Sequence, residues 1–91
     1  MKHHILVKWK DNCQPETKSV QALFDEALSI PGVHSVSLHS NVVDRPNRYD
    51  LLILMCMDQG ALETFDASDV HKQWKQQYGE QIAQKAIFDC D

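Results

Sequence analysis

The chain of 91 residues contains only three glycines, three prolines and three cysteines, and none of these residue types is concentrated in one segment. With 43% hydrophobic and 24% charged residues, this composition excludes a collagen-like or low-complexity chain and is typical of a folded domain. We therefore interpret residues 1–91 as a single domain. A domain of this size buries roughly two-thirds of the surface that its unfolded chain exposes, so a second copy would usefully extend its core.

The cysteines Cys13, Cys56 and Cys90 are odd in number and far apart, and no C-x-x-C pair occurs. This spacing excludes a disulfide framework and is typical of a reducing compartment. A zinc site is not supported, because zinc ligands usually come in close pairs. The one close pair here, His3 and His4, would point to opposite faces of a strand. We expect no metal and no other cofactor.

The chain also lacks a basic excess and a long hydrophobic run. Its net charge of −4 argues against nucleic acid as a partner, because binding to phosphates requires a concentrated basic face. The longest uncharged apolar run, "LLILMCM", is far shorter than the ~20 residues of a membrane-spanning helix. The start, "MKHHILVKWK", has too short an apolar stretch for a signal peptide. We expect a cytoplasmic protein that does not enter a membrane.

Short apolar or β-branched stretches between turn residues predict four strands, at 3–10, 33–40, 49–57 and 85–90. An amphipathic pattern predicts a helix over 16–30, which the Pro31-Gly32 pair ends. A second helix is predicted in two pieces, the first running from a cap at Asp58 to Phe65 and the second from about 69 to 78. A further helical turn through "EQIAQ" is also compatible with the sequence.

The predicted order, β-α-β-β-α-β, indicates an α+β fold of the ferredoxin-like type: a four-stranded antiparallel sheet with both helices on one face. The strand at 49–57 is apolar on both faces, however, and the helices cover only one of them. Leaving Leu52, Leu54 and Cys56 exposed would create an apolar surface patch at the centre of the sheet, which would favour aggregation. We therefore expect a homodimer in which two sheets pack face to face.

The segment "DASDVHKQW" contains the most conspicuous candidate for a functional residue. Ser68 is a good N-cap for the helix that follows it, and His71, Trp74 and Tyr78 would share one face of that helix. His71 is compatible with three interpretations: a histidine of the core, a pocket or catalytic residue, or a surface residue. His3 is its natural partner, because it begins the apolar face of the first strand.

Four segments resemble the stress-responsive A/B barrel (Dabb) domains of the dimeric α+β barrel group. They are "KHHILVKWK", "IPGVHSVSLHSN", "RYDLLILMCMDQGALETFDASDVH" and "KAIFDCD", and together they span nearly the whole chain. The resemblance implies a protomer whose sheet pairs with that of a second copy to close a β-barrel. It also implies a pocket between the sheet and the helices, near His3 and His71. Residues expected to line this pocket are Trp9, Phe24, Leu51, Ile53, Met55, Phe65 and Trp74.

One plant enzyme of this group cyclises a linear polyketide by an aldol reaction, using a tyrosine and a helix histidine as an acid/base pair. The motif often present there, Y-x-x-H-P-x-H, corresponds to "FDASDVH" in this chain, so the last histidine is His71. Phe65 stands at the position of the tyrosine, and a further histidine of the group would fall at Leu51.

Three functions remain open at this stage. The first is a homodimeric protein that binds a hydrophobic or aromatic small molecule or has a stress-related role. The second is an enzyme of the polyketide cyclase, lyase or cofactor-free monooxygenase type, with His71 as general base and His3 as its helper. The third is a structural or regulatory partner module. Arg45 and Arg48 would attract an anionic ligand if the loop before the third strand borders a pocket.

Overall fold

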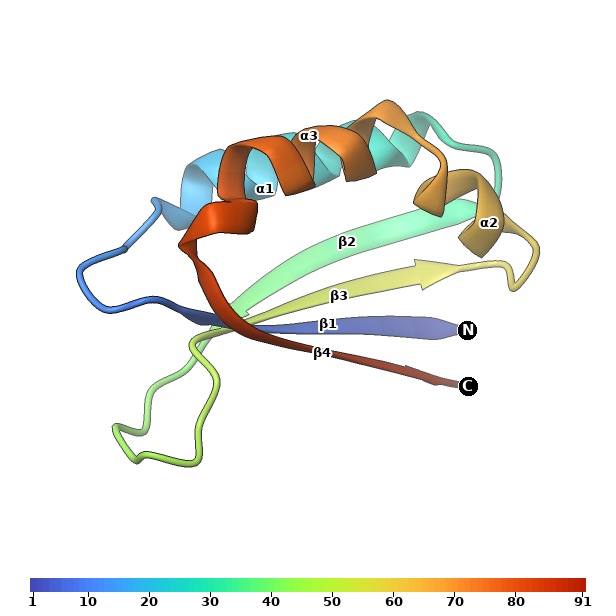
Figure 1. Cartoon of the computed structure of the whole chain (residues 1–91). Coiled ribbons are helices and arrows are strands. Elements are labelled where there is room, and N and C mark those ends of the chain that lie inside the picture. The colour runs from blue at the N-terminus through green and yellow to red at the C-terminus, as the bar shows by residue number, and fades with distance from the viewer.

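The computed structural model describes residues 1–91 and has the element order predicted for a ferredoxin-like fold. The strands are β1 (Lys2–Trp9), β2 (Val33–Ser40), β3 (Leu51–Met57) and β4 (Ile82–Cys90). They form one antiparallel sheet in the order β2-β3-β1-β4. The helices are α1 (Thr17–Asp25), α2 (Ala61–Asp66) and α3 (Asp69–Tyr78), and all three cover the same face of the sheet (Figure 1).

The face of the sheet that the helices cover, here called the inner face, carries the core. On β3 the residues at alternate positions from Leu51 to Met57 are buried, because successive strand residues point to opposite faces. From the helices, Phe24, Phe65 and Trp74 are almost fully buried, and their rings contact one another edge-on or at a tilt. Such aromatic pairs contribute ~0.5–1.5 kcal/mol each beyond the area that they bury.

The opposite, outer face of the sheet has no helix over it. The strand register places Leu6 of β1 beside Leu52 of β3, and His4 beside Leu54. Phe88 of β4 lies next to His4 in the same layer and is 61% exposed. An apolar layer therefore crosses three neighbouring strands on the side away from the helices, as the two-sided pattern of β3 predicts.

Several predicted boundaries differ from those of the structure. The strand predicted at 3–10 runs over 2–9, the strand predicted at 49–57 begins at Leu51, and the strand predicted at 85–90 begins at Ile82.

The helical segments differ as well. The helix predicted over 16–30 ends as α-helix at Asp25 and continues as a 3₁₀ turn, Glu26–Ser29. Asp58 does not cap α2: Gly60 precedes that helix, and the carboxylate of Asp58 instead lies 2.8 Å from Nε2 of His34. A further helical turn through "EQIAQ" does not form, because a 3₁₀ turn, Gly79–Gln81, ends α3 and β4 begins at Ile82, opposite Trp9.

Gly32, between the first helical region and β2, holds α2 close to the sheet. Its φ of 92° is a left-handed conformation that residues with a side chain rarely adopt. A Cβ at this position would lie 3.1 Å from Cβ of Ala61, at the start of α2. The turn thus requires glycine both for its backbone conformation and for the close approach of α2.

None of the three helices is long and apolar enough to cross a membrane.

Candidate functional site

A cavity of about 290 Å³ lies between the inner face of the sheet, at β1 and β4, and the helices α2 and α3. Its apolar lining is Ile5, Leu62, Trp74 and Ile87, and its polar lining is His3, Asp66, His71, Lys85 and Asp89. The strand residues meet there because His3 and Ile5 are paired in register with Asp89 and Ile87. The volume is close to the lower end of the ~300–1,000 Å³ that ligand pockets occupy.

His3 is held in this cavity by Asp89. The Nδ1 atom of the imidazole lies 2.5 Å from Oδ1 of Asp89, and the histidine is only 4% exposed. Because a carboxylate can only accept a hydrogen bond, this contact favours the tautomer with the proton on Nδ1. Nε2 then carries the lone pair. Nε2 is not among the fully enclosed polar atoms without a partner, so it keeps some exposure, and His3 is one of the residues that line the cavity.

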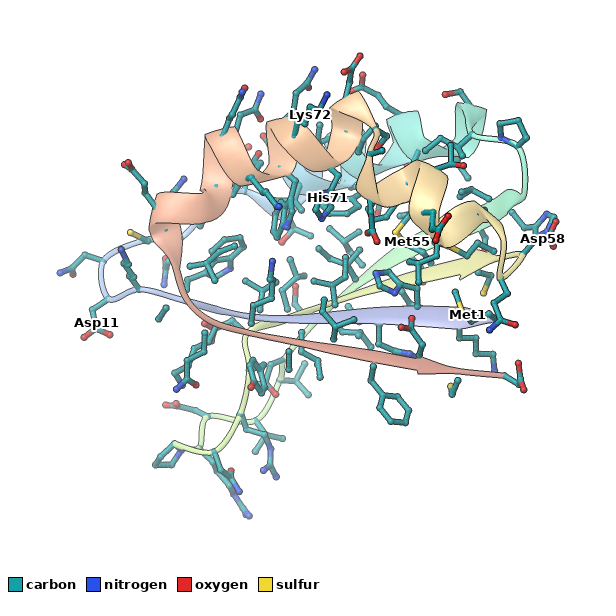
Figure 2. The ribbon with its side chains drawn as sticks, turned by 45° about the vertical axis from the view of Figure 1, so that its right-hand side comes forward. Met1, Asp11, Met55, Asp58, His71 and Lys72 are labelled. Atoms are coloured by element: carbon teal, nitrogen blue, oxygen red, sulfur yellow. The ribbon has the colours of Figure 1, made fainter.

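His71 enters the cavity from the first turn of α3. Its backbone N–H donates to Oγ of Ser68, 3.3 Å away, which confirms Ser68 as the N-cap. The side chain points toward the sheet, whereas that of Lys72 points away from it (Figure 2). Burial lowers the pKa of His71, and the positive charge of Lys75 lowers it further, while Asp66 acts in the opposite direction. At neutral pH the imidazole is therefore uncharged and can accept a proton or a hydrogen bond.

Phe65 packs against both imidazoles and, contrary to expectation, does not itself border the cavity. Its ring is fully buried, with ring centroids 6.0 Å from His3 and 5.4 Å from His71, both in edge-on geometry. The position that the family resemblance associates with a tyrosine therefore supplies an apolar ring and no hydroxyl. Any proton moved between the cavity's imidazoles must pass through a ligand or water.

Of the other residues expected to line the pocket, only one borders the cavity. Trp74 borders the cavity. Phe24, Ile53 and Met55 are fully buried in the core and do not border it, and Trp9 packs against Trp74 with ring centroids 6.1 Å apart. Leu51 lies near the other end of the sheet, where it pairs with Val7 and borders a different hollow on the outer face.

The sequence analysis did not identify several residues that line the cavity, above all Asp89, Lys85 and Asp66. A signal for the first two was present, because Lys85, Ile87 and Asp89 alternate along β4 and must share one face. Their partners could not be read from the sequence, since they depend on how β4 pairs with β1. For Asp66, a charged residue at the end of a short helix gave no signal.

No protein-family model matches this sequence, and no match was found among curated protein sequences. Solved structures do match the fold. A dimeric ferredoxin-like protein of unknown function from Thermobifida fusca has a TM-score of 0.77 at 13% identity, over 96% of this chain and 85% of that one. A protein from Arabidopsis thaliana reaches a TM-score of 0.80 at 15% identity, over 99% and 92% of the two chains.

A Dabb family protein with a ferredoxin-like fold from Mesorhizobium loti matches with a TM-score of 0.64 at 10% identity, over 99% of this chain and 93% of that one. Two further matches carry the names of enzymes. They are a hydroxynitrile lyase from Passiflora edulis (TM-score 0.74, 10% identity) and a putative antibiotic biosynthesis monooxygenase from Bordetella bronchiseptica (TM-score 0.73, 18% identity). At these identities the likeness establishes a ferredoxin-like fold that this chain shares with dimeric proteins.

Proposed function

We propose that this protein is a homodimer of the stress-responsive A/B barrel type whose cavity binds a small molecule with an apolar body and a hydrogen-bonding group. The observation that carries the binding role is the composition of the cavity. Two imidazoles, His3 and His71, face the same space as the apolar side chains of Ile5, Leu62 and Trp74. Ligand pockets generally combine such apolar walls with a few polar groups that fix the orientation of the ligand.

The homodimer is supported by two independent observations. The outer face carries an apolar layer of Leu6, Leu52, Leu54 and Phe88, and several proteins of similar structure are described as dimeric. A stress-related role rests on the resemblance of the four sequence segments to the A/B barrel family. A cytoplasmic location is part of the proposal and is supported by three cysteines that are all free.

The binding role can be tested with phenol, which has an aromatic body and one hydroxyl, in a titration of the ¹⁵N-labelled protein followed by NMR. We expect phenol to shift the indole N–H of Trp74 and to bind several-fold more weakly to the His71→Ala variant. Anisole, which lacks the hydroxyl donor, should bind more weakly than phenol. His34→Ala is the matched control, because His34 is exposed on β2 and does not border the cavity.

The binding proposal fails if phenol leaves Trp74 unshifted at millimolar concentration. It fails equally if His71→Ala and His34→Ala bind phenol with the same affinity as the unmodified protein.

A second candidate function is proton-transfer catalysis of the lyase, polyketide cyclase or monooxygenase type. The contact between His3 and Asp89 favours it, because a carboxylate that orients an imidazole and stabilises its protonated form is a common arrangement for a general base. His71, with its lowered pKa, is a second base in the same cavity. Since Phe65 cannot donate a proton, the acid in such a reaction would be a protonated imidazole or the ammonium of Lys85.

Catalysis can be tested without knowledge of the substrate by following hydrogen–deuterium exchange at the acidic carbon of acetylacetone in D₂O. General-base catalysis contributes about 10²–10⁴-fold, so we expect His3→Ala to reduce the protein-dependent rate by at least about 100-fold. His34→Ala should leave this rate unchanged. A rate that is equal in the unmodified protein, in His3→Ala and in buffer alone would exclude this catalytic role while leaving the binding role intact.

A further inference from the structure

A second hollow, of about 350 Å³, lies on the outer face of the sheet, within the apolar layer that the proposed dimer would cover. Leu6 and Leu52, which are cross-strand neighbours, supply its apolar floor. The loop that joins β2 to β3, residues 41–50, supplies much of its wall. Figure 1 shows this loop extending from the sheet on the side opposite to the helices, which is the side from which a second sheet would approach.

The loop that walls this hollow, here called the socket, is held in shape by its own hydrogen bonds. The backbone N–H of Asn41 donates to the carbonyl oxygen of Asp50, at 2.9 Å, which joins the two ends of the loop. Within the loop the N–H of Arg48 donates to the carbonyl oxygen of Arg45, at 3.2 Å. The socket is therefore formed before anything enters it, and a preformed site loses less conformational entropy when it is filled.

Phe88 is the one large hydrophobic residue on the outer face of β4. The alternation along the strand places Gln84, Ala86 and Cys90 on the same face. The side chain of Phe88 is held in place by its neighbour on β1: Nδ1 of His4 donates to the carbonyl oxygen of Phe88 at 3.0 Å, and the two rings meet edge-on with centroids 5.9 Å apart. At 61% exposure it is an ordered aromatic side chain without cover, and aromatic residues are enriched in protein interfaces.

Phe88 and the socket lie on either side of the middle of the sheet. Phe88 pairs with His4, and Ala86 pairs with Leu6, so the socket floor lies two residues along the strand from Phe88 and one to two strands across. With ~4.8 Å between strands and ~3.4 Å per residue, the midpoint between them falls near β1, one of the two central strands. A two-fold axis through this midpoint, lying between two facing sheets, sets Phe88 of each copy over the socket of the other and keeps the sheets overlapped.

We infer that the socket of each protomer receives Phe88 of the partner subunit. This inference rests on the homodimer proposed above and specifies how its two sheets are aligned. The phenyl ring packs on Leu6 and Leu52, and Arg48, which lines the socket and forms no ion pair, places a guanidinium beside it. Arginine is the cation that most often pairs with an aromatic ring. Because a two-fold interface is self-complementary, the contact occurs twice in each dimer.

The first test measures the dissociation constant of the dimer by sedimentation equilibrium. We expect Phe88→Ala to raise this constant at least about tenfold, because a buried aromatic residue at the centre of an interface contributes much of its affinity. Ile87→Ala is the matched control. Ile87 is the preceding residue on β4 and is 49% exposed, but it borders the cavity on the other face of the sheet.

The second test asks whether Phe88 touches the socket of the other copy. Within one protomer Phe88 and Leu52 lie on strands that β1 separates, so without a contact between copies the effects of Phe88→Ala and Leu52→Ala should be independent. We expect the double variant to raise the dissociation constant by less than the product of the two single effects. In a mixture of isotope-labelled and unlabelled protein, a filtered NOE spectrum should show the ring of Phe88 close to the methyl groups of the partner's Leu52.

Two results would overturn the inference and leave the homodimer standing. One is an equal effect of Phe88→Ala and Ile87→Ala on the dissociation constant. The other is a dimer in which the effects of Phe88→Ala and Leu52→Ala simply multiply and the NOE between copies is absent. An unmodified protein that is monomeric at micromolar concentration would instead exclude the homodimer itself, and the inference with it.

Discussion

Oδ1 of Asp89 lies 2.5 Å from Nδ1 of His3, and the two residues are direct neighbours across the β1–β4 ladder. The contact joins a partly exposed carboxylate to a buried imidazole, and both residues line the cavity. It therefore links the stability of the sheet edge to the chemistry of the candidate site. The sequence favours His71 as the base and His3 as its helper, but of these two histidines only His3 has a carboxylate partner.

Removing the carboxylate should destabilise the protein. We expect Asp89→Ala to lower the free energy of unfolding by about 1–3 kcal/mol, because the buried imidazole loses the acceptor of its Nδ1 proton. Asp89→Asn keeps an acceptor oxygen and should cost less. Urea unfolding at fixed protein concentration measures both, with Asp91→Ala, at an exposed position, as the control. Equal stability of the Asp89→Ala and Asp91→Ala variants would contradict the assigned bond.

The lowered pKa of His71 predicts the direction of a pH effect on stability. The unfolded chain titrates at the ordinary histidine value of 6.5, above the folded value, so below that pH it binds more protons than the folded protein does. The contribution of His71 to stability is therefore fully present above pH 6.5 and decreases as the pH falls from there toward the folded pKa.

The measurement is the difference in unfolding free energy between the unmodified protein and His71→Gln, determined from pH 8 to pH 5. We expect the unmodified protein to lose stability relative to the variant below pH 6.5. A difference that stays constant over this range would show that the fold does not shift the pKa of His71.

The two glycines Gly32 and Gly79 should respond in opposite ways to alanine. Gly32→Ala places a Cβ 3.1 Å from that of Ala61 at a φ of 92°, so we expect a loss of more than about 1 kcal/mol. Gly79 has a φ of −53° and open space around its Cβ position, so Gly79→Ala should be neutral or stabilising by up to ~1 kcal/mol. Thermal unfolding of both variants tests the pair, and equal effects would refute the role assigned to Gly32.

If the outer faces of two sheets form the dimer interface, a charge introduced on that face should dissociate the dimer, and a charge introduced elsewhere should not. We expect the unmodified protein to sediment as a dimer at micromolar concentration and Leu54→Asp to sediment as a folded monomer, because a carboxylate would be buried between two sheets. Leu28→Asp is the control, since Leu28 is 45% exposed on the helical side of the molecule. A monomeric unmodified protein, or a dimeric Leu54→Asp variant, would exclude the sheet-to-sheet arrangement.

The sequence predicted those parts of the molecule that depend on local pattern. The strand at 33–40 and the helix at 69–78 are confirmed residue for residue, because turn residues and a clear N-cap at Ser68 mark their ends. The N-cap predicted at Asp58 is wrong, because the carboxylate of Asp58 contacts the imidazole of His34 instead. These two residues are 24 positions apart, so local sequence could not predict the contact. His3 and Asp89 could not be paired in advance, because 86 positions separate them and a slip of one residue would turn one of them to the other face.

The strand order β2-β3-β1-β4 makes β4, the last strand along this sequence, a neighbour of β1, the first. Contacts between such distant segments are slow to form, because most of the chain must be brought into a closed loop first. A nascent chain that ends before Ile82 leaves one edge of β1 unpaired and leaves His3 without its carboxylate. The cavity is complete only when β4 has paired with β1, because Lys85, Ile87 and Asp89 of β4 form part of its lining.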